Sequence, residues 1–170
     1  MIANALSIAG SDPSGGAGVQ ADLKAFSARG VYGMAAMTAL TAQNTQGVTR
    51  AEPVAPDLAA AQIAALRADI RIDAVKIGMI ATAEIAATVA DALDGLAAPV
   101  VLDPVMVAKG GARLLAEDAV AALAARLLPR AAVVTPNLPE AAALLGAPVA
   151  ATRAEMAEQA RALVALGARA

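Results

Sequence analysis

The N-terminal part of the chain contains the segment Ser7-Ile8-Ala9-Gly10-Ser11-Asp12-Pro13-Ser14-Gly15-Gly16-Ala17-Gly18-Val19-Gln20-Ala21-Asp22. In it a short apolar strand runs into a glycine-rich loop, and the loop runs into a helix. Glycine lets a loop approach a ligand closely and adopt positive φ without steric cost. The helix that follows directs free N–H groups and the positive end of its dipole at the loop. The segment therefore predicts a site for a small molecule or a phosphate on an α/β scaffold.

Apolar strands and helical patterns alternate along the rest of the 170 residues. We expect strands at 5–9, 35–42, 74–79, 99–105 and 131–135, and helices at 18–29, 57–70, 83–93, 117–127, 139–145 and 153–166. Near-continuous apolar strands separated by helices are typical of a mostly parallel sheet covered on both faces. The sequence shows no linker, so residues 1–170 are expected to form a single domain. A further strand is expected after the last helix, so this domain is expected to be incomplete, with an open sheet edge.

The composition disfavours several classes of site. With no histidine and no cysteine, the chain lacks the commonest general base and any thiolate for a disulfide or a metal. A net charge of −2, with one tyrosine and one phenylalanine, disfavours nucleic-acid binding. No apolar run approaches the roughly 18 residues that span a bilayer, and there is no secretion signal at the N-terminus. We therefore expect a cytoplasmic protein that does not bind membranes.

Two familiar nucleotide-binding patterns fit the glycine-rich loop poorly. Residues 16–21 match the loose dinucleotide pattern, but residues 38–45 lack the acidic residue that would bind a ribose. Gly10 and Gly15 have the spacing of a P-loop, but Gly16-Ala17 replace the required Lys-Ser/Thr pair. An NAD-binding half-domain is therefore disfavoured, and a P-loop is excluded.

Two adjacent amides, Gln43 and Asn44, follow the second predicted strand. Ligands bind beyond the carboxyl ends of strands in sheets of this kind. An amide offers an acceptor and two donors in one plane, which matches the ring nitrogen and exocyclic amine of an aminopyrimidine. Spacing alone favours the alternative of a polar turn in which Asn44 bonds its own backbone.

The later strands carry further candidates. Asp103, held extended by Pro104, either helps to hold a hydrated Mg²⁺ or is an ordinary turn residue. Asn137 and Glu140, at the start of a predicted helix, either form a capping box or face a metal–phosphate cluster. Met79 fits core packing better than a pocket wall.

Two lysines complete the set of polar candidates. Lys76 and Lys109 are each able to meet a phosphate, although most surface lysines have no specific role. The segment Lys109-Gly110-Gly111 also has the composition of a flap over a site.

Taken together, five segments resemble the hydroxymethylpyrimidine/phosphomethylpyrimidine kinases of thiamine biosynthesis, within the ribokinase-like superfamily. The segments are 9–22, 40–48, 76–79, 101–106 and 135–141. The resemblance implies a three-layer αβα sandwich around a mostly parallel sheet. It also implies transfer of a phosphoryl group from ATP, with Mg²⁺, to 4-amino-5-hydroxymethyl-2-methylpyrimidine and then to its monophosphate. The complete enzyme is expected to be a homodimer.

The resemblance also implies roles for individual residues. Gln43 is expected to hydrogen-bond the aminopyrimidine edge, in a pocket lined by Gly10, Ala17, Met79 and Val105. The Mg–ATP phosphates are expected beside Asp103, Asn137 and Glu140.

This sequence lacks part of the family's pattern. The later half of the family's pattern is absent: it carries a lysine-glycine-glycine strand end, distinct from residues 109–111, and the Gly-Thr-Gly-Cys loop that forms the anion hole. We therefore assign no catalytic residue and interpret the sequence as the N-terminal portion of such a kinase. One alternative is a pyridoxine/pyridoxal kinase of the same superfamily, whose members tend to lack glutamine at the position of Gln43. Another is a non-catalytic pyrimidine-binding remnant.

Overall fold

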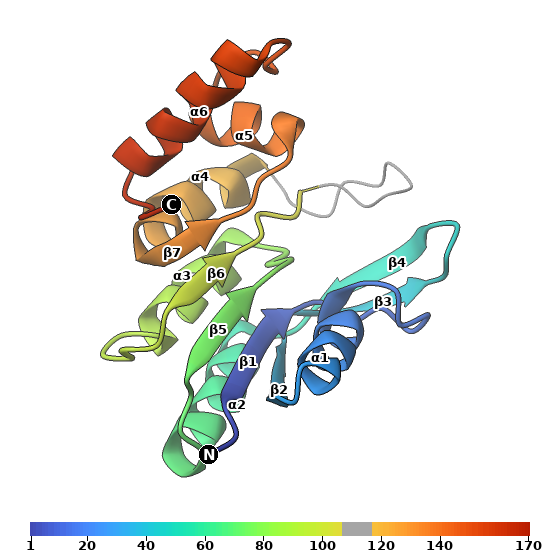
Figure 1. Ribbon diagram of the computed structural model, residues 1–170. Coiled ribbons are helices and arrows are strands. Elements are labelled where there is room, and N and C mark those ends of the chain that lie inside the picture. Colours follow the sequence, from blue (N-terminus) through green and yellow to red (C-terminus); the bar gives the residue numbers. More distant parts are fainter. Residues whose placement is uncertain (107–116) are drawn as a thin grey trace.

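The computed structural model describes residues 1–106 and 117–170, and within them a five-stranded parallel sheet runs through the middle of the molecule (Figure 1). The strand order is β2-β1-β5-β6-β7. The strands are β1 (Asn4–Ala9), β2 (Tyr32–Met37), β5 (Ala74–Ile77), β6 (Val100–Leu102) and β7 (Ala131–Val134). Neighbouring pairs along this order are all parallel, which confirms the predicted α/β fold.

Helices cover both faces of the sheet (Figure 1). On one face α1 (Gly18–Ala28) packs on β1 and β2, and on the other α2 (Pro56–Asp69), α3 (Ala83–Ala92) and α4 (Glu117–Arg126) lie in a row. The short 3-10 helix η1 (Leu128–Arg130) leads into β7, and beyond β7 lie the paired helices α5 (Leu138–Leu145) and α6 (Arg153–Ala165). The six predicted helices agree with these bounds to within one residue at each end.

The core lies between the sheet and the row of three helices. Leu6 and Ile8 of β1 are fully buried, as are Ile77 of β5 and Leu102 of β6. Because side chains alternate across a strand, Ser7 of β1 points to the opposite face, where its hydroxyl meets Asp22 of α1. Burial of each large aliphatic side chain contributes about 1.5–3 kcal/mol relative to exposure. The carboxyl ends of β1, β5 and β6 are therefore held on a rigid platform.

The predicted strand at 35–42 is wrong, because two strands occupy that stretch. β2 ends at Met37, and β3 (Ala39–Gln43) pairs antiparallel with β4 (Val48–Pro53), which the sequence analysis does not predict. Thr38 separates the two strands and is fully buried. Its N–H donates to the Ala9 carbonyl at 3.0 Å, and its hydroxyl donates to the Met79 carbonyl at 2.6 Å. Thr38 thus anchors a β3–β4 hairpin that projects past the carboxyl end of the sheet (Figure 1).

The chain after α6 returns to the sheet. The Arg169 N–H donates to the Ala131 carbonyl at 3.0 Å, and the Val134 N–H donates to the Ala170 carbonyl at 2.8 Å. Residues 169 and 170, which follow the end of the last helix, therefore lie along β7. None of the helices in the described ranges has both the length and the apolar character needed to cross a membrane.

Gly18, at the start of α1, provides a test of the tight packing under the loop. Its φ is +57°, and a Cβ there would lie 2.3 Å from the Gly10 carbonyl oxygen. We expect Gly18→Ala to lower the free energy of unfolding by about 3 kcal/mol, because both the backbone and this contact reject a side chain. Urea denaturation measures the change. The control is Gly47→Ala, since a Cβ on Gly47 meets no atom within 4 Å. Equal stabilities for the two variants would contradict the described loop packing.

Candidate active site

A cavity of about 290 Å³ opens at the carboxyl ends of β1, β5 and β6, beside the glycine-rich loop. Cavities of roughly this size accommodate small heteroaromatic ligands. The five residues predicted to form a pyrimidine pocket, Gly10, Ala17, Gln43, Met79 and Val105, all line it. The structure thus brings together residues from distant parts of the sequence, and their contacts with a ligand remain predictions.

Asp12 holds the glycine-rich loop in shape. One carboxylate oxygen, Oδ1, accepts hydrogen bonds from the N–H of Ser14 at 2.9 Å and from its hydroxyl at 2.8 Å. The other, Oδ2, accepts from the N–H groups of Gly16 at 3.1 Å and Ala17 at 2.8 Å. Burial raises the pKa of Asp12, but these hydrogen bonds outweigh burial and hold the pKa below its ordinary 3.8. The loop is therefore organised around a carboxylate of the chain itself.

These contacts change the interpretation of the loop. The N–H groups of Gly16 and Ala17 donate to the Asp12 carboxylate and so are not available to a ligand. A phosphate placed there would be repelled by the same carboxylate. The loop instead contributes a close-fitting wall, because a Cβ on Gly10 would lie 3.0 Å from the Met79 sulfur. Of the two predicted ligand types, the loop favours the uncharged small molecule.

The β3–β4 hairpin supplies the opposite wall through Gln43. The ladder shifts register between Ala42 and Gln43, and a bulge of this kind redirects the side chain beside it. Gln43 Oε1 accepts a 3.3 Å hydrogen bond from the Thr41 hydroxyl, and Nε2 has no hydrogen-bond partner in the described part of the chain. Gln43 therefore has hydrogen-bonding capacity left for a ligand in the cavity.

Asn44 has a different role from its neighbour. Its Oδ1 accepts from the N–H groups of Gln46 at 2.9 Å and Gly47 at 3.2 Å, which closes the hairpin turn. The turn interpretation is confirmed for Asn44, and only Gln43 of the two amides lines the cavity.

Ser11 and Thr41 join the loop to the hairpin. The Ser11 hydroxyl accepts from the Thr41 N–H at 3.0 Å, and the Thr41 hydroxyl donates to the Ser11 carbonyl at 2.9 Å. The Ser11 N–H donates to the Ala39 carbonyl at 2.9 Å. The two walls of the cavity are thereby fixed to each other.

Acidic and basic side chains form another part of the cavity lining. Asp103 follows β6, and its backbone N–H donates to the Ile77 carbonyl at 2.8 Å. Lys76 of β5 places its Nζ 3.7 Å from Asp103 Oδ2 and 3.1 Å from Asp22 Oδ2. Asp22, on α1, is a lining residue that the sequence analysis did not single out.

Asn137 and Glu140 lie outside this cavity lining and form the capping box of α5. Asn137 Oδ1 accepts from the Glu140 N–H and Glu140 Oε2 accepts from the Asn137 N–H, both at 2.9 Å. The capping interpretation is therefore confirmed. Burial raises the pKa of the Glu140 carboxyl, and the charge of Asp103 raises it further, against hydrogen bonds from the N–H groups of Asn137 and Met106. Glu140 and Asp103 are thus close enough to repel each other.

This pair of carboxylates is suited to Mg²⁺ only if other ligands contribute. The described residues contain no group of three or more acidic, histidine or cysteine side chains that could hold a metal. Mg²⁺ commonly keeps several waters and is held by one or two carboxylates together with substrate phosphates. Asp103 and Glu140 fit that arrangement, and they do not form a complete metal cage. Lys109 and the expected flap at 109–111 lie outside the described residues.

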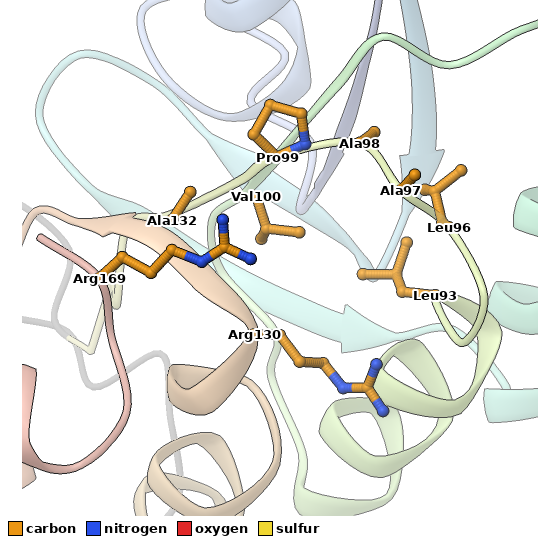
Figure 2. A pocket seen from close by; sticks show the side chains of 9 residues that line it. All are labelled: Leu93, Leu96, Ala97, Ala98, Pro99, Val100, Arg130, Ala132 and Arg169. Atoms are coloured by element: carbon orange, nitrogen blue, oxygen red, sulfur yellow. The ribbon is translucent and has the colours of Figure 1, made fainter.

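A second cavity, of about 350 Å³, lies at the amino ends of β6 and β7. Figure 2 shows the side chains of Arg130 and Arg169 among the residues that line it. Arg130 is paired with Asp94. None of the predicted site residues lines this cavity, and ligands of parallel sheets bind at the opposite edge. The cavity beside the glycine-rich loop is therefore the candidate active site.

The lowered pKa of Asp12 gives the stability of the loop a defined pH dependence. We expect Asp12→Asn to lower the free energy of unfolding by about 2–4 kcal/mol at pH 7, because charge-assisted hydrogen bonds are lost. The wild type should exceed Asp12→Asn in free energy of unfolding by the full amount above pH 3.8. This difference should disappear as the pH falls through the pKa of Asp12 in the folded state, which lies below 3.8. Urea denaturation between pH 3 and pH 7 measures the difference. The exposed Asp69→Asn is the control, and an equal loss there would contradict the role of Asp12.

The Glu140 carboxyl should contribute to stability with the opposite dependence on pH. Because its pKa is raised above the ordinary 4.5, ionising it destabilises the folded state, so Glu140→Gln should gain stability relative to wild type as the pH rises above 4.5. Glu155 occupies the same position in the capping box of α6, but hydrogen bonds from the N–H groups of Ala151 and Thr152 lower its pKa. Glu155→Gln should therefore lose relative stability as the pH rises toward 4.5, and show no further change above it. Denaturation at pH 3, pH 5 and pH 8 distinguishes them, because the Glu155 change falls in the lower interval and the Glu140 change is of opposite sign and falls above pH 4.5; changes of the same sign would refute this account.

Comparison with known proteins shows which family this chain belongs to. The family model described as "Phosphomethylpyrimidine kinase" matches residues 12–170. The hydroxymethylpyrimidine/phosphomethylpyrimidine kinase of Escherichia coli is 56% identical over 165 residues, which cover 96% of this chain and 62% of that relative. The chain thus spans somewhat less than two thirds of the length of that protein.

Two solved structures extend the likeness to the fold. The phosphomethylpyrimidine kinase of Clostridium difficile aligns with a TM-score of 0.90 and 42% identity, covering 98% of this chain and 72% of that one. The pyridoxal kinase of Staphylococcus aureus, in complex with pyridoxal, aligns with a TM-score of 0.89 and 36% identity, covering 99% of this chain and 61% of that one. On these matches the chain belongs to the phosphomethylpyrimidine kinase family.

Proposed function

We propose that the full-length protein carrying this sequence phosphorylates 4-amino-5-hydroxymethyl-2-methylpyrimidine, and then its monophosphate, at the expense of Mg–ATP in thiamine diphosphate synthesis. Membership of the family and the arrangement of the cavity support the proposal. The observation that carries it is one cavity lined by a glutamine, Gln43, by apolar side chains and by a carboxylate, Asp103.

The pyrimidine is proposed to lie between the loop and the hairpin. Met79, Val105 and Ala17 offer apolar contacts to a flat ring, and Gly10 permits the close approach. The Gln43 amide is able to donate to a ring nitrogen and accept from the exocyclic amine in one plane. The loop suits an uncharged ring, because the Asp12 carboxylate already accepts hydrogen bonds from the N–H groups of Gly16 and Ala17.

The Mg–ATP phosphates are proposed to lie toward Asp103 and Glu140, with Asn137 orienting Glu140 through the capping box. Phosphoryl transfer depends on positioning and on neutralisation of charge more than on covalent catalysis, so the absence of histidine is no obstacle. A bound Mg²⁺ would supply that neutralisation, and these carboxylates would hold it together with the phosphates.

The resemblance places the anion-hole loop and its cysteine outside this sequence, so we propose the reaction for the full-length protein. We also propose that residues 1–170 belong to one kinase domain and that the enzyme is a cytoplasmic homodimer.

A pyridoxal kinase is the second candidate, and the fold similarity to the Staphylococcus aureus enzyme favours it. A pyridine ring presents no edge that combines a ring nitrogen with an amine. Gln43 in the cavity therefore supports the pyrimidine over pyridoxal. Steady-state phosphorylation of the two compounds by the full-length protein decides between them. Binding of the pyrimidine without phosphoryl transfer would instead support a non-catalytic remnant.

Gln43→Ala tests the substrate assignment. We expect the affinity of the full-length protein for the aminopyrimidine to fall about 10- to 100-fold, because the exocyclic amine and the ring nitrogen lose their partner. Isothermal titration calorimetry measures the affinity directly.

The matched control is Gln46→Ala, which removes an exposed amide from the same hairpin. That variant should bind the pyrimidine within about twofold of wild type. Unchanged affinity in Gln43→Ala, or an equal loss in Gln46→Ala, would remove Gln43 from the site.

A further inference from the structure

Lys76 is a charged residue of the cavity lining to which the proposed function gives no role. It belongs to the segment Lys76-Ile77-Gly78-Met79, of which only Met79 has been assigned to the pocket. The Lys76 side chain is 22% exposed, and its Nζ lies 3.1 Å from Asp22 Oδ2. The Ser7 hydroxyl donates to the same Asp22 oxygen at 2.6 Å. One side of the ammonium group is therefore fixed by a carboxylate that is itself anchored to β1.

Gly78 provides the space in which the Lys76 side chain lies. Residues i and i+2 of an extended chain point to the same side, so a side chain at 78 would follow that of Lys76. A Cβ on Gly78 would lie 2.8 Å from Lys76 Nζ and 3.1 Å from the Ala9 Cβ. The φ of Gly78 is not in the left-handed region, so its backbone conformation does not require glycine. The contact with the ammonium group therefore explains why glycine is suited to this position.

The charges around the cavity show what this ammonium group does. Besides Asp12, which the loop satisfies, the charged side chains in the described lining are Asp22, Lys76 and Asp103. Lys76 Nζ lies between the two carboxylates, 3.7 Å from Asp103 Oδ2. Without this cation the two acidic groups would face each other across the cavity with no compensating charge, and Asp103 would lose the contact that holds its side chain.

We propose that Lys76, held in the space above Gly78 by Asp22 and Ser7, is a positioning residue that holds Asp103 in place for the phosphoryl donor. The inference rests on the proposed function and gives a role to two residues of that site. The inference predicts different effects for the acidic side of the cavity, which holds Asp103, and for the pyrimidine side. Loss of the Lys76 cation should impair the phosphoryl-transfer step while leaving the pyrimidine wall of Gly10, Gln43 and Met79 intact.

The test uses the full-length protein and the variants Lys76→Ala, Lys76→Arg, Gly78→Ala and Lys76→Ala/Gly78→Ala. We expect Lys76→Ala to lower kcat about 30-fold or more, while the calorimetric Kd for the aminopyrimidine changes less than about threefold. Gly78→Ala should also lower kcat, because its methyl group displaces the ammonium group. In the Lys76→Ala background the same methyl group should have a much smaller effect, because the contact with the ammonium group is gone and only the 3.1 Å contact with the Ala9 Cβ remains.

Two further measurements separate positioning from a general loss of structure. Ethylammonium added to Lys76→Ala should restore part of kcat, and Lys76→Arg should retain more activity than Lys76→Ala. Gly47→Ala, which adds a methyl group where no atom lies within 4 Å, should have wild-type kcat. Restored activity cannot arise from an unfolded variant.

The outcomes distinguish this inference from the proposed function. A wild-type protein that fails to phosphorylate the aminopyrimidine overturns both. An active wild type with unchanged kcat in Lys76→Ala overturns the role of Lys76 alone. The same conclusion follows if Lys76→Ala weakens pyrimidine binding as much as it lowers kcat, or if the Lys76 and Gly78 effects are additive. A 30-fold loss confined to kcat, with non-additivity and rescue by ethylammonium, supports the inference.

Discussion

The four hydrogen bonds to the Asp12 carboxylate are the contacts on which the rest of the site depends. They fold the segment from Ser14 to Ala17 around one buried charge and place that charge at the start of α1, where the helix dipole favours it. Gly10 and Ala17 reach the cavity only because the loop takes this shape. The loop is thus complete without a ligand, and its binding surface exists before any substrate arrives.

Much of the fold was predictable because burial on both faces leaves a clear pattern in the sequence. The apolar runs of β1, β5, β6 and β7 lie between helices whose predicted ends agree with the structure. The β3–β4 hairpin was missed for two physical reasons. Thr38 lies between apolar residues, so the break after β2 has no signal in the pattern of hydrophobicity. β4 is largely exposed and lacks the alternation that marks a half-buried strand.

The candidate site was predictable as a set of residue types, and less so as a set of contacts. The positions of Gln43, Met79 and Val105 around one cavity agree with the resemblance, although their ligand contacts remain predictions. Sequence spacing does suggest the capping box of Asn137 and Glu140. It does not reveal that the Asp12 carboxylate occupies the loop N–H groups, because an aspartate in a glycine-rich turn has many possible partners. The pairing of Lys76 with Asp22 joins residues 54 positions apart and requires the fold.

The attachment of the hairpin through Thr38 has a consequence for how the family can diversify. Gln43 belongs to a small sheet whose own ladder lies outside the five-stranded sheet, while Asp103 and Lys76 belong to strands or strand ends of the main sheet. Under the proposed function, substitutions in the hairpin can therefore alter the ring contact made by Gln43 without changing the hydrogen-bonded ladder that carries Asp103 and Lys76. A change of ring contact from the hairpin and a change on the acidic side of the cavity would then begin in separate sheets of one scaffold.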